Sequence, residues 1–173
     1  MAKKKVKKDK IPALIIIGLV LLTILSSFKN FYPLTMKVVE IQGFKRVFVD
    51  LELEEERGIV KLYSDCHELR MEISKEQAVS IINGENKIRY FRPLTHDLMS
   101  DIIEGYGIKV LMVKIVDIKN NTYFADLVLR YGNKILSLDS RPSDALAIAA
   151  RTDYLVPVYV KEEILEKYGI KTC

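Results

Sequence analysis

The sequence predicts an α+β domain with a mixed or antiparallel sheet and three to four helices, preceded by one N-terminal transmembrane helix. The first observation is an uninterrupted apolar run at residues 11–28, directly after a lysine-rich tail. The second is that strand-like and helix-like patterns follow one another without strict alternation, which favours α+β over α/β. The third is that 49% of the 173 residues are hydrophobic, which excludes a disordered chain.

The N-terminal segment has the composition of a membrane anchor. Residues 1–10 contain six lysines and one aspartate, a net charge of +5, and residues 11–28 contain no charged residue. As a helix, that run would span about 27 Å, close to the hydrocarbon thickness of a bilayer. We therefore expect a cytoplasmic tail at 1–10, a transmembrane anchor at 11–28, a linker at 29–35 and a domain at 36–173.

Two other interpretations of the apolar run remain open, a cleaved signal peptide and a buried helix of the domain. A cleavage site needs small residues at the −3 and −1 positions, and no Ala-x-Ala occurs near the end of the run. Only Lys29 follows the run directly, so the positive-inside rule puts the N-terminus in the cytoplasm. The expected localisation is a single-pass membrane protein with an extracytoplasmic domain.

The first half of the domain shows strand patterns followed by one helix. Val47 to Leu53 alternates apolar and polar residues, as a half-buried strand does. Ser74 and Gln77 have the spacing of a capping box, which opens a helix ending near Asn83-Gly84. Strands are expected at residues 36–41, 47–53, 59–63 and 69–73.

The second half begins with a helix from Thr95, a good N-cap residue, to Glu104. Asn120-Asn121 suits a tight hairpin turn, because asparagine tolerates positive φ. Pro142 at the first position of a helix costs no hydrogen bond. Strands are expected at 108–118, 122–131 and 134–138, and a short strand and a helix should follow the Pro142 helix. The body of the Pro142 helix should be buried at Ala145, Ala147, Ile148 and Ala149.

Three segments carry a resemblance to a known family. Residues 140–151 read Ser-Arg-Pro-Ser-Asp-Ala-Leu-Ala-Ile-Ala-Ala-Arg, residues 92–98 read Arg-Pro-Leu-Thr-His-Asp-Leu, and residues 121–125 read Asn-Thr-Tyr-Phe-Ala. In this order they resemble the bifunctional nuclease family, whose name refers to activity on DNA and RNA. The resemblance covers roughly residues 36–170, with Ser74 standing where the family usually has a glycine. It implies a domain, but no set of catalytic residues.

Candidate catalytic residues lie at two helix starts, His96 with Asp97 and Arg141 with Asp144. Helix starts expose side chains and present N–H groups that favour an anion such as phosphate. We expect the two pairs to approach each other, with His96 moving a proton and Arg141, together with Ser143, contacting substrate. The ordinary alternative is that Asp144 only caps its helix and that His96 is a surface residue.

Carboxylates on the Thr95 helix suggest a metal site. Asp97, Asp101 and Glu104 follow one helix face without a lysine or arginine among them. Hard cations prefer carboxylate oxygens, so we expect Asp97, Asp101 and Asp144 to bind a divalent metal, Mg²⁺ or Mn²⁺. The alternative is a solvated polar face opposite the apolar one. The apolar face comprises Leu98, Met99, Ile102, Ile103 and Tyr106.

The charge balance and the two cysteines give weaker indications of function. Residues 29–173 contain 21 Lys and Arg against 22 Asp and Glu, a net charge of −1. This near-neutral balance is not that of a protein which binds nucleic acid mainly by neutralising phosphates. Cys66 and Cys173 have no metal-site spacing, and both are expected to be free thiols.

Two functional hypotheses follow. The first is a membrane-tethered hydrolase that resembles bifunctional nucleases and cleaves DNA or RNA phosphodiesters with a divalent metal. The second is a non-catalytic, homo-oligomeric binding or assembly module at a membrane surface. Convergence of the two helix starts favours the first hypothesis, whereas carboxylates buried in ion pairs favour the second.

Overall fold

The fold comes from a computed structural model that describes residues 41–173. The predicted tail, anchor and linker, residues 1–35, lie outside the described residues, as does nearly all of the strand predicted at 36–41. Within residues 41–173, no helix has the length and apolar character needed to cross a membrane.

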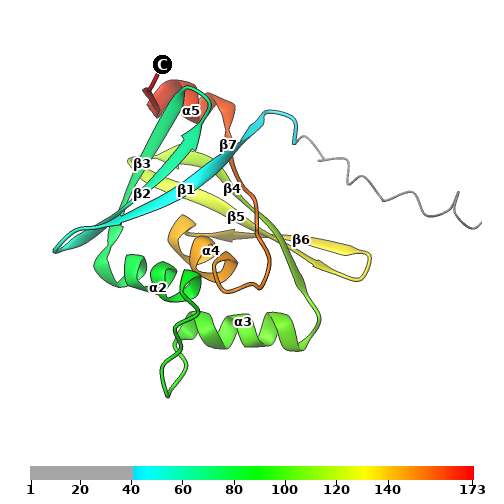
Figure 1. The fold of residues 1–173 in the computed structure, drawn as a ribbon. Coiled ribbons are helices and arrows are strands. Elements are labelled where there is room, and N and C mark those ends of the chain that lie inside the picture. Colours follow the sequence, from blue (N-terminus) through cyan, green and yellow to red (C-terminus); the bar gives the residue numbers. More distant parts are fainter. Residues whose placement is uncertain (1–40) are drawn as a thin grey trace, which may run out of the picture. The chain divides into compact units, whose positions relative to one another are not determined.

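Eight strands form one sheet in the order β6-β5-β4-β7-β1-β2-β3-β8 (Figure 1). All neighbouring pairs are antiparallel except β4 and β7, which are parallel. With four helices among the described residues, the α+β class and the mixed sheet are confirmed. The strands are β1 (Phe44–Leu53), β2 (Arg57–Ser64), β3 (His67–Ser74), β4 (Lys109–Lys119), β5 (Thr122–Tyr131), β6 (Lys134–Ser140), β7 (Val158–Lys161) and β8 (Ile170–Lys171).

The helices are α2 (Lys75–Glu85), α3 (Thr95–Gly105), α4 (Pro142–Ala149) and α5 (Glu162–Tyr168). The sheet curves around α4, which packs against β4, β5, α2 and α3 (Figure 1). α5 lies at the other end of the domain, beside β3 and β7. α4 is therefore the central helix, and the starts of α3 and α4 come from two neighbouring elements.

Local sequence signals explain where α2 begins and where the chain turns between β4 and β5. The Gln77 N–H donates to Ser74 Oγ at 3.3 Å, and the Ser74 N–H donates to Gln77 Oε1 at 3.0 Å, so the predicted capping box is confirmed. Asn120 and Asn121 have φ values of +48° and +60°. These left-handed conformations form the tight turn between β4 and β5 that the asparagine pair predicted.

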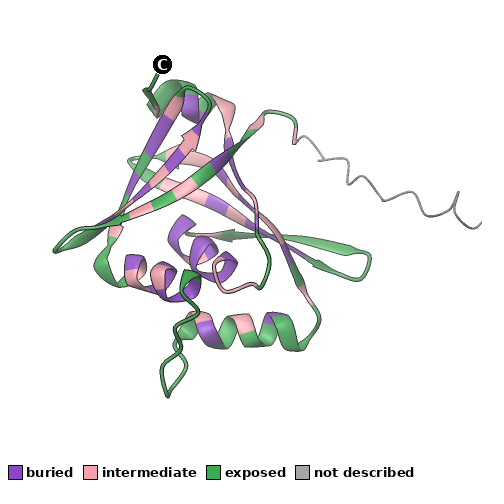
Figure 2. Cartoon of the chain, in the orientation of Figure 1, coloured by how far each residue is buried: buried purple, intermediate pink, exposed green. Residues whose placement is uncertain are grey.

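The core lies between α4 and the concave side of the sheet, and Figure 2 shows α4 as an almost wholly buried helix. Pro142 opens α4 as predicted. All four α4 residues expected to be buried are buried: Ala145, Ala147, Ile148 and Ala149. α2 approaches the end of α4 closely at Gly84, where an added Cβ would lie 3.0 Å from the Cβ of Ala150 and 3.3 Å from the carbonyl oxygen of Ala147.

α3 differs from the expected orientation of an amphipathic helix. Of its apolar face only Ile103 is buried, whereas Leu98, Met99 and Ile102 are exposed and so is Tyr106 just after the helix. Of the polar face Asp97 turns inward and is only 3% exposed, whereas Asp101 and Glu104 remain exposed. The helix begins one residue earlier than predicted, with Leu94 instead of Thr95 as its N-cap. The inward turn has a specific cause, a buried arginine that pairs with Asp97.

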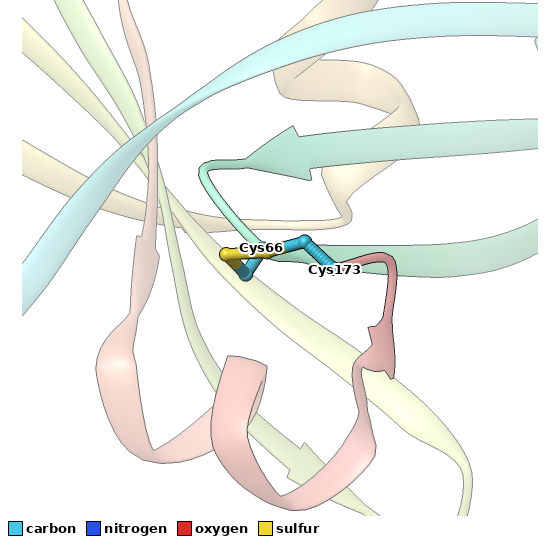
Figure 3. The surroundings of a disulfide bond; sticks show 2 residues. All are labelled: Cys66 and Cys173. Carbon is cyan, nitrogen blue, oxygen red and sulfur yellow. A yellow bond between two sulfur atoms is a disulfide. The ribbon is translucent and has the colours of Figure 1, made fainter.

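The prediction of two free thiols is wrong. Cys66, in the turn between β2 and β3, forms a disulfide with Cys173, with 5.1 Å between the Cα atoms (Figure 3). Two β8 residues pair antiparallel with the start of β3. This short strand was not predicted, and it brings the end of the chain back beside Cys66.

Candidate functional site

The starts of α3 and α4 meet at His96. The His96 Nε2 atom lies 3.3 Å from Asp144 Oδ1, and the Nδ1 atom lies 2.9 Å from Oγ of Ser80 on α2. The imidazole is thus held at both nitrogens, by a carboxylate on one side and a hydroxyl on the other. The Asp144 carboxylate can only accept a hydrogen bond, so this contact favours a proton on Nε2 and leaves Nδ1 as the nitrogen that can accept one.

Arg141 completes this group at the N-cap of α4. Its Nε donates to Asp144 Oδ2 at 2.7 Å, and its Nη2 donates to Asp144 Oδ1 at 3.2 Å. The hydrogen bonds to Asp144 raise the pKa of Arg141. The side chain of Arg141 is 70% exposed, while those of His96 and Asp144 are 23% and 26% exposed. The cluster of Ser80, His96, Arg141 and Asp144, named the histidine cluster below, therefore reaches the surface.

Asp97, the fourth residue expected here, points away from the histidine cluster. Its Oδ1 accepts a hydrogen bond of 2.7 Å from Arg151 Nε, and its Oδ2 accepts one of 2.9 Å from the Leu94 N–H. Burial by itself raises the pKa of Asp97, but these two donors and the charge of Arg151 together hold it below its ordinary value. Asp97 is therefore an ionised, buried carboxylate in which each oxygen accepts one hydrogen bond from the protein.

Arg151 joins the three helices that carry the histidine cluster. Its Nη1 donates to the Ser80 carbonyl at 3.0 Å on α2 and to the Ala147 carbonyl at 2.7 Å on α4. Its Nε holds Asp97 on α3, and its side chain is only 6% exposed. Gly84 leaves room for this side chain, because a Cβ there would lie 2.9 Å from Arg151 Nη1. The Asp97–Arg151 pair is thus buried, and it holds α2, α3 and α4 in position relative to one another.

Ser143 and Asp101, two further residues of the predicted site, also lie outside the histidine cluster. Ser143, expected to contact substrate, is 4% exposed, since it faces the core side of α4. Asp101 forms an exposed ion pair of 2.6 Å with Arg89. Sequence reasoning missed Ser80 and Arg151 as neighbours of the site. Arg151 is the last residue of segment 140–151, and the family resemblance of that segment was a signal for it. Nothing in the sequence pointed to Ser80.

The expected metal ligands Asp97, Asp101 and Asp144 are not brought together. Each is paired with a different arginine, and no group of three or more His, Cys, Asp or Glu side chains within residues 41–173 could hold a metal ion. A Mg²⁺ or Mn²⁺ site would need carboxylate oxygens directed at one point. The predicted ligand set therefore does not fit a divalent metal in this arrangement.

Comparison with known proteins points to one family. A model of the bifunctional nuclease domain matches residues 60–172. A protein of Mycobacterium tuberculosis, named only as uncharacterized, is 37% identical over 98 residues, which cover 57% of this chain and 57% of the relative.

Plant proteins named as bifunctional nucleases are also similar. Bifunctional nuclease 1 of Oryza sativa subsp. japonica is 29% identical over 102 residues, which cover 57% of this chain and 30% of the relative. Bifunctional nuclease 2 of Arabidopsis thaliana is 29% identical over 97 residues, which cover 54% of this chain and 29% of the relative. The match thus spans about half the length of the mycobacterial relative and under a third of the plant ones.

Proposed function

Because the chain belongs to the bifunctional nuclease domain family, we propose that it hydrolyses DNA or RNA phosphodiesters at the histidine cluster. The observation that carries the proposal is the contact of His96 with Asp144 at 3.3 Å, beside the exposed guanidinium of Arg141. This contact joins two helix starts that are 48 residues apart in sequence. It combines a proton carrier and a cation at one surface position.

In the proposed reaction a water attacks the phosphorus atom and the bond from phosphorus to the leaving oxygen breaks. His96 accepts the proton of the attacking water at Nδ1, the nitrogen that does not contact the Asp144 carboxylate, and the protonated imidazole then gives that proton to the leaving oxygen. Asp144 orients the imidazole through Nε2, and the attacking water takes the place of Ser80 Oγ at Nδ1. Positioned proton transfer of this kind contributes about 10²- to 10⁴-fold to a rate.

Arg141 would contact the phosphate. Two of its donors already bind Asp144, and Nη1 has no hydrogen bond within the described residues. Guanidinium groups bind phosphate oxygens through charge-assisted hydrogen bonds. Because the side chain is mostly exposed, a phosphate can reach it without rearrangement of the core. The proposal routes no step through a metal, since the expected ligand set does not converge.

We further propose that a membrane anchor at residues 11–28 holds the domain outside the cytoplasm. Six lysines precede that run and one follows it directly, which favours a cytoplasmic N-terminus. The Cys66–Cys173 disulfide supports the same side of the membrane, because disulfides persist in oxidising compartments and are rare in the cytosol. Two unrelated features thus favour one orientation.

The nuclease proposal is tested with the full-length chain in a mild detergent, on labelled single- and double-stranded DNA and RNA. Parallel reactions contain Mg²⁺, Mn²⁺ or a chelator, which measures metal dependence directly. His96→Ala should reduce cleavage at least 100-fold, and Asp144→Asn should reduce it strongly while the melting temperature stays nearly unchanged. Asp101→Asn, on the same helix but outside the cluster, is the matched control.

Equal cleavage by the wild type and His96→Ala would show that the activity, if any, arises elsewhere. The orientation is tested separately in intact cells, by labelling the cysteines with a membrane-impermeant maleimide after mild reduction. We expect labelling without lysis, and labelling only after lysis would place the domain in the cytoplasm.

The second candidate is a non-catalytic, homo-oligomeric binding or assembly module at a membrane surface. The exposed apolar face of α3 favours it, as does the burial of Asp97 in an ion pair. The two functions separate in the assay above, because the module predicts no cleavage of any substrate under any metal condition.

A further inference from the structure

Ser80, His96 and Asp144 form a chain of two hydrogen bonds. The Oγ atom of Ser80 lies 2.9 Å from His96 Nδ1, and His96 Nε2 lies 3.3 Å from Asp144 Oδ1. Because the carboxylate can only accept, the imidazole proton is on Nε2 and the Ser80 hydroxyl donates to the lone pair of Nδ1. A hydroxyl next to a base that a third group orients is the arrangement that activates a serine as a nucleophile.

Three different helices hold these side chains in place. Ser80 lies in the middle of α2, and its carbonyl oxygen accepts a hydrogen bond of 3.0 Å from Nη1 of the buried Arg151. Both oxygens of Asp144 on α4 are bound by Arg141, at 2.7 and 3.2 Å. His96 lies between them at the start of α3. The hydroxyl, the ring and the carboxylate are therefore oriented before a substrate binds, and such orientation lowers a reaction barrier.

Access to the hydroxyl is narrow. Ser80 is 8% exposed, whereas the side chains of His96 and Asp144 are 23% and 26% exposed. The imidazole and the carboxylate therefore meet solvent, and the serine lies deeper. An acyl group that reaches Oγ of Ser80 has to be short, because a long chain would collide with the helices around it.

We propose that Ser80 is a nucleophile and that the domain hydrolyses short-chain carboxylic esters through an acylated serine. In the first step Oγ of Ser80 attacks the carbonyl carbon of the ester, and the hydroxyl proton moves to His96 Nδ1. The bond from that carbon to the alcohol oxygen breaks, and His96 gives the proton to the departing alcohol. The product of this step is an ester between the acyl group and Ser80.

A water completes the reaction in the second step. It attacks the acyl carbon and gives a proton to His96 Nδ1. The bond between that carbon and Oγ of Ser80 breaks, the proton passes from Nδ1 to Oγ, and the carboxylic acid leaves. In both steps Asp144 accepts the hydrogen bond of Nε2–H and keeps Nδ1 directed at Ser80, as the third member of such a triad does.

This activity goes beyond the proposed cleavage of phosphodiesters. In that reaction a water occupies the position of Ser80 Oγ and Arg141 contacts a charged phosphate. Here Ser80 itself forms a covalent bond, and an uncharged ester needs no cation. The two activities have different substrates and products, so failure of the nuclease assay and failure of the ester assay are distinguishable.

The first test looks for the acylated serine in the wild-type chain. The full-length chain in a mild detergent is mixed with p-nitrophenyl acetate, the reaction is stopped with acid, and acetyl groups are located by peptide mass spectrometry. We expect an acetyl ester on Ser80. Ser137 of β6 is an internal control, because it is exposed and forms no hydrogen bond to a histidine within residues 41–173. Acetyl groups on lysines or on Ser137, with none on Ser80, would overturn the proposal.

The second test measures release of p-nitrophenol by variants. Ser80→Ala should reduce it to the level of the unfolded chain, and His96→Ala should reduce it at least about 100-fold. Asp144→Asn should also reduce it, whereas Asp101→Asn, outside the cluster, is the matched control. The wild type should hydrolyse the acetate faster than the octanoate, since Ser80 is nearly buried.

A rate that is unchanged in Ser80→Ala would show that the imidazole attacks the ester directly, and it would refute the nucleophilic role of Ser80. The melting temperature of each variant is measured alongside. If a variant fails to fold, the acetyl ester on wild-type Ser80 still decides the question, because its detection needs no substitution.

Discussion

Replacing Asp97 by alanine tests whether this residue has a structural role instead of a chemical one. The change leaves Arg151 buried and charged, with its side chain 6% exposed, and it also removes the acceptor of the Leu94 N–H. Removing one partner of a buried ion pair costs about 3–5 kcal/mol. For a domain with a urea m-value of about 1.5 kcal/mol/M, this lowers the unfolding midpoint by about 2–3 M.

Asp101→Ala is the matched control for this prediction. It removes the same residue type from the same helix, and Asp101 also pairs with an arginine, at 2.6 Å. That pair is about half exposed on both sides, and exposed pairs contribute about 0–1 kcal/mol. The two variants therefore differ chiefly in the burial of the carboxylate.

The assay is urea unfolding of the full-length chain in a mild detergent at pH 7, followed by circular dichroism. The double variant Asp97→Ala with Arg151→Ala should cost less than the sum of the two single changes, because no buried charge is left unpaired. A loss below about 1 kcal/mol for Asp97→Ala, or simple additivity in the double variant, would refute the reasoning. Nuclease activity that disappears while stability is unchanged would assign Asp97 a chemical role.

Three further predictions concern stability. The pKa of Asp97 is lowered in the folded state. The ion pair therefore stabilises the fold fully above about pH 4, and this stabilisation is lost as the pH falls through the folded pKa. Asp97→Asn should reduce this loss of stability at low pH, measured by urea unfolding between about pH 2 and 7. Ala149→Leu should cost about 1–3 kcal/mol by overpacking between α4 and its neighbours, and an unchanged melting curve would contradict the burial described. Reduction of Cys66–Cys173, or a double serine variant, should lower stability by about 2–5 kcal/mol because the bond closes a long loop; identical unfolding with and without reductant would argue against the bond.

Local signals in the sequence were sufficient for much of the fold. The Ser74–Gln77 spacing, the Asn120-Asn121 turn and Pro142 each act within a few residues of themselves, and each defines an element boundary in the structure. The meeting of His96 with Asp144 was also predictable, because both residues lie at helix starts and expose their side chains.

What the sequence could not decide depends on contacts between distant residues. An amphipathic pattern predicts that α3 has two faces, but it does not predict which face packs inward. The orientation depends on Arg151, which pairs with Asp97 from 54 residues away in the sequence. The same contact removes Asp97 from the metal set that its spacing suggested. Cys66 and Cys173, 107 residues apart, carry no local signal of pairing because β8, which brings them together, is only two residues long.

The bond between Cys66 and Cys173 closes a covalent ring that contains every residue of the histidine cluster. A protease that cuts one exposed loop inside this ring, such as the segment before α3, would leave both fragments joined. The nicked domain would keep α2, α3 and α4 on one continuous molecule, and the fragments would separate on a gel only after reduction. This topology protects the assembled site from dispersal after a single cleavage.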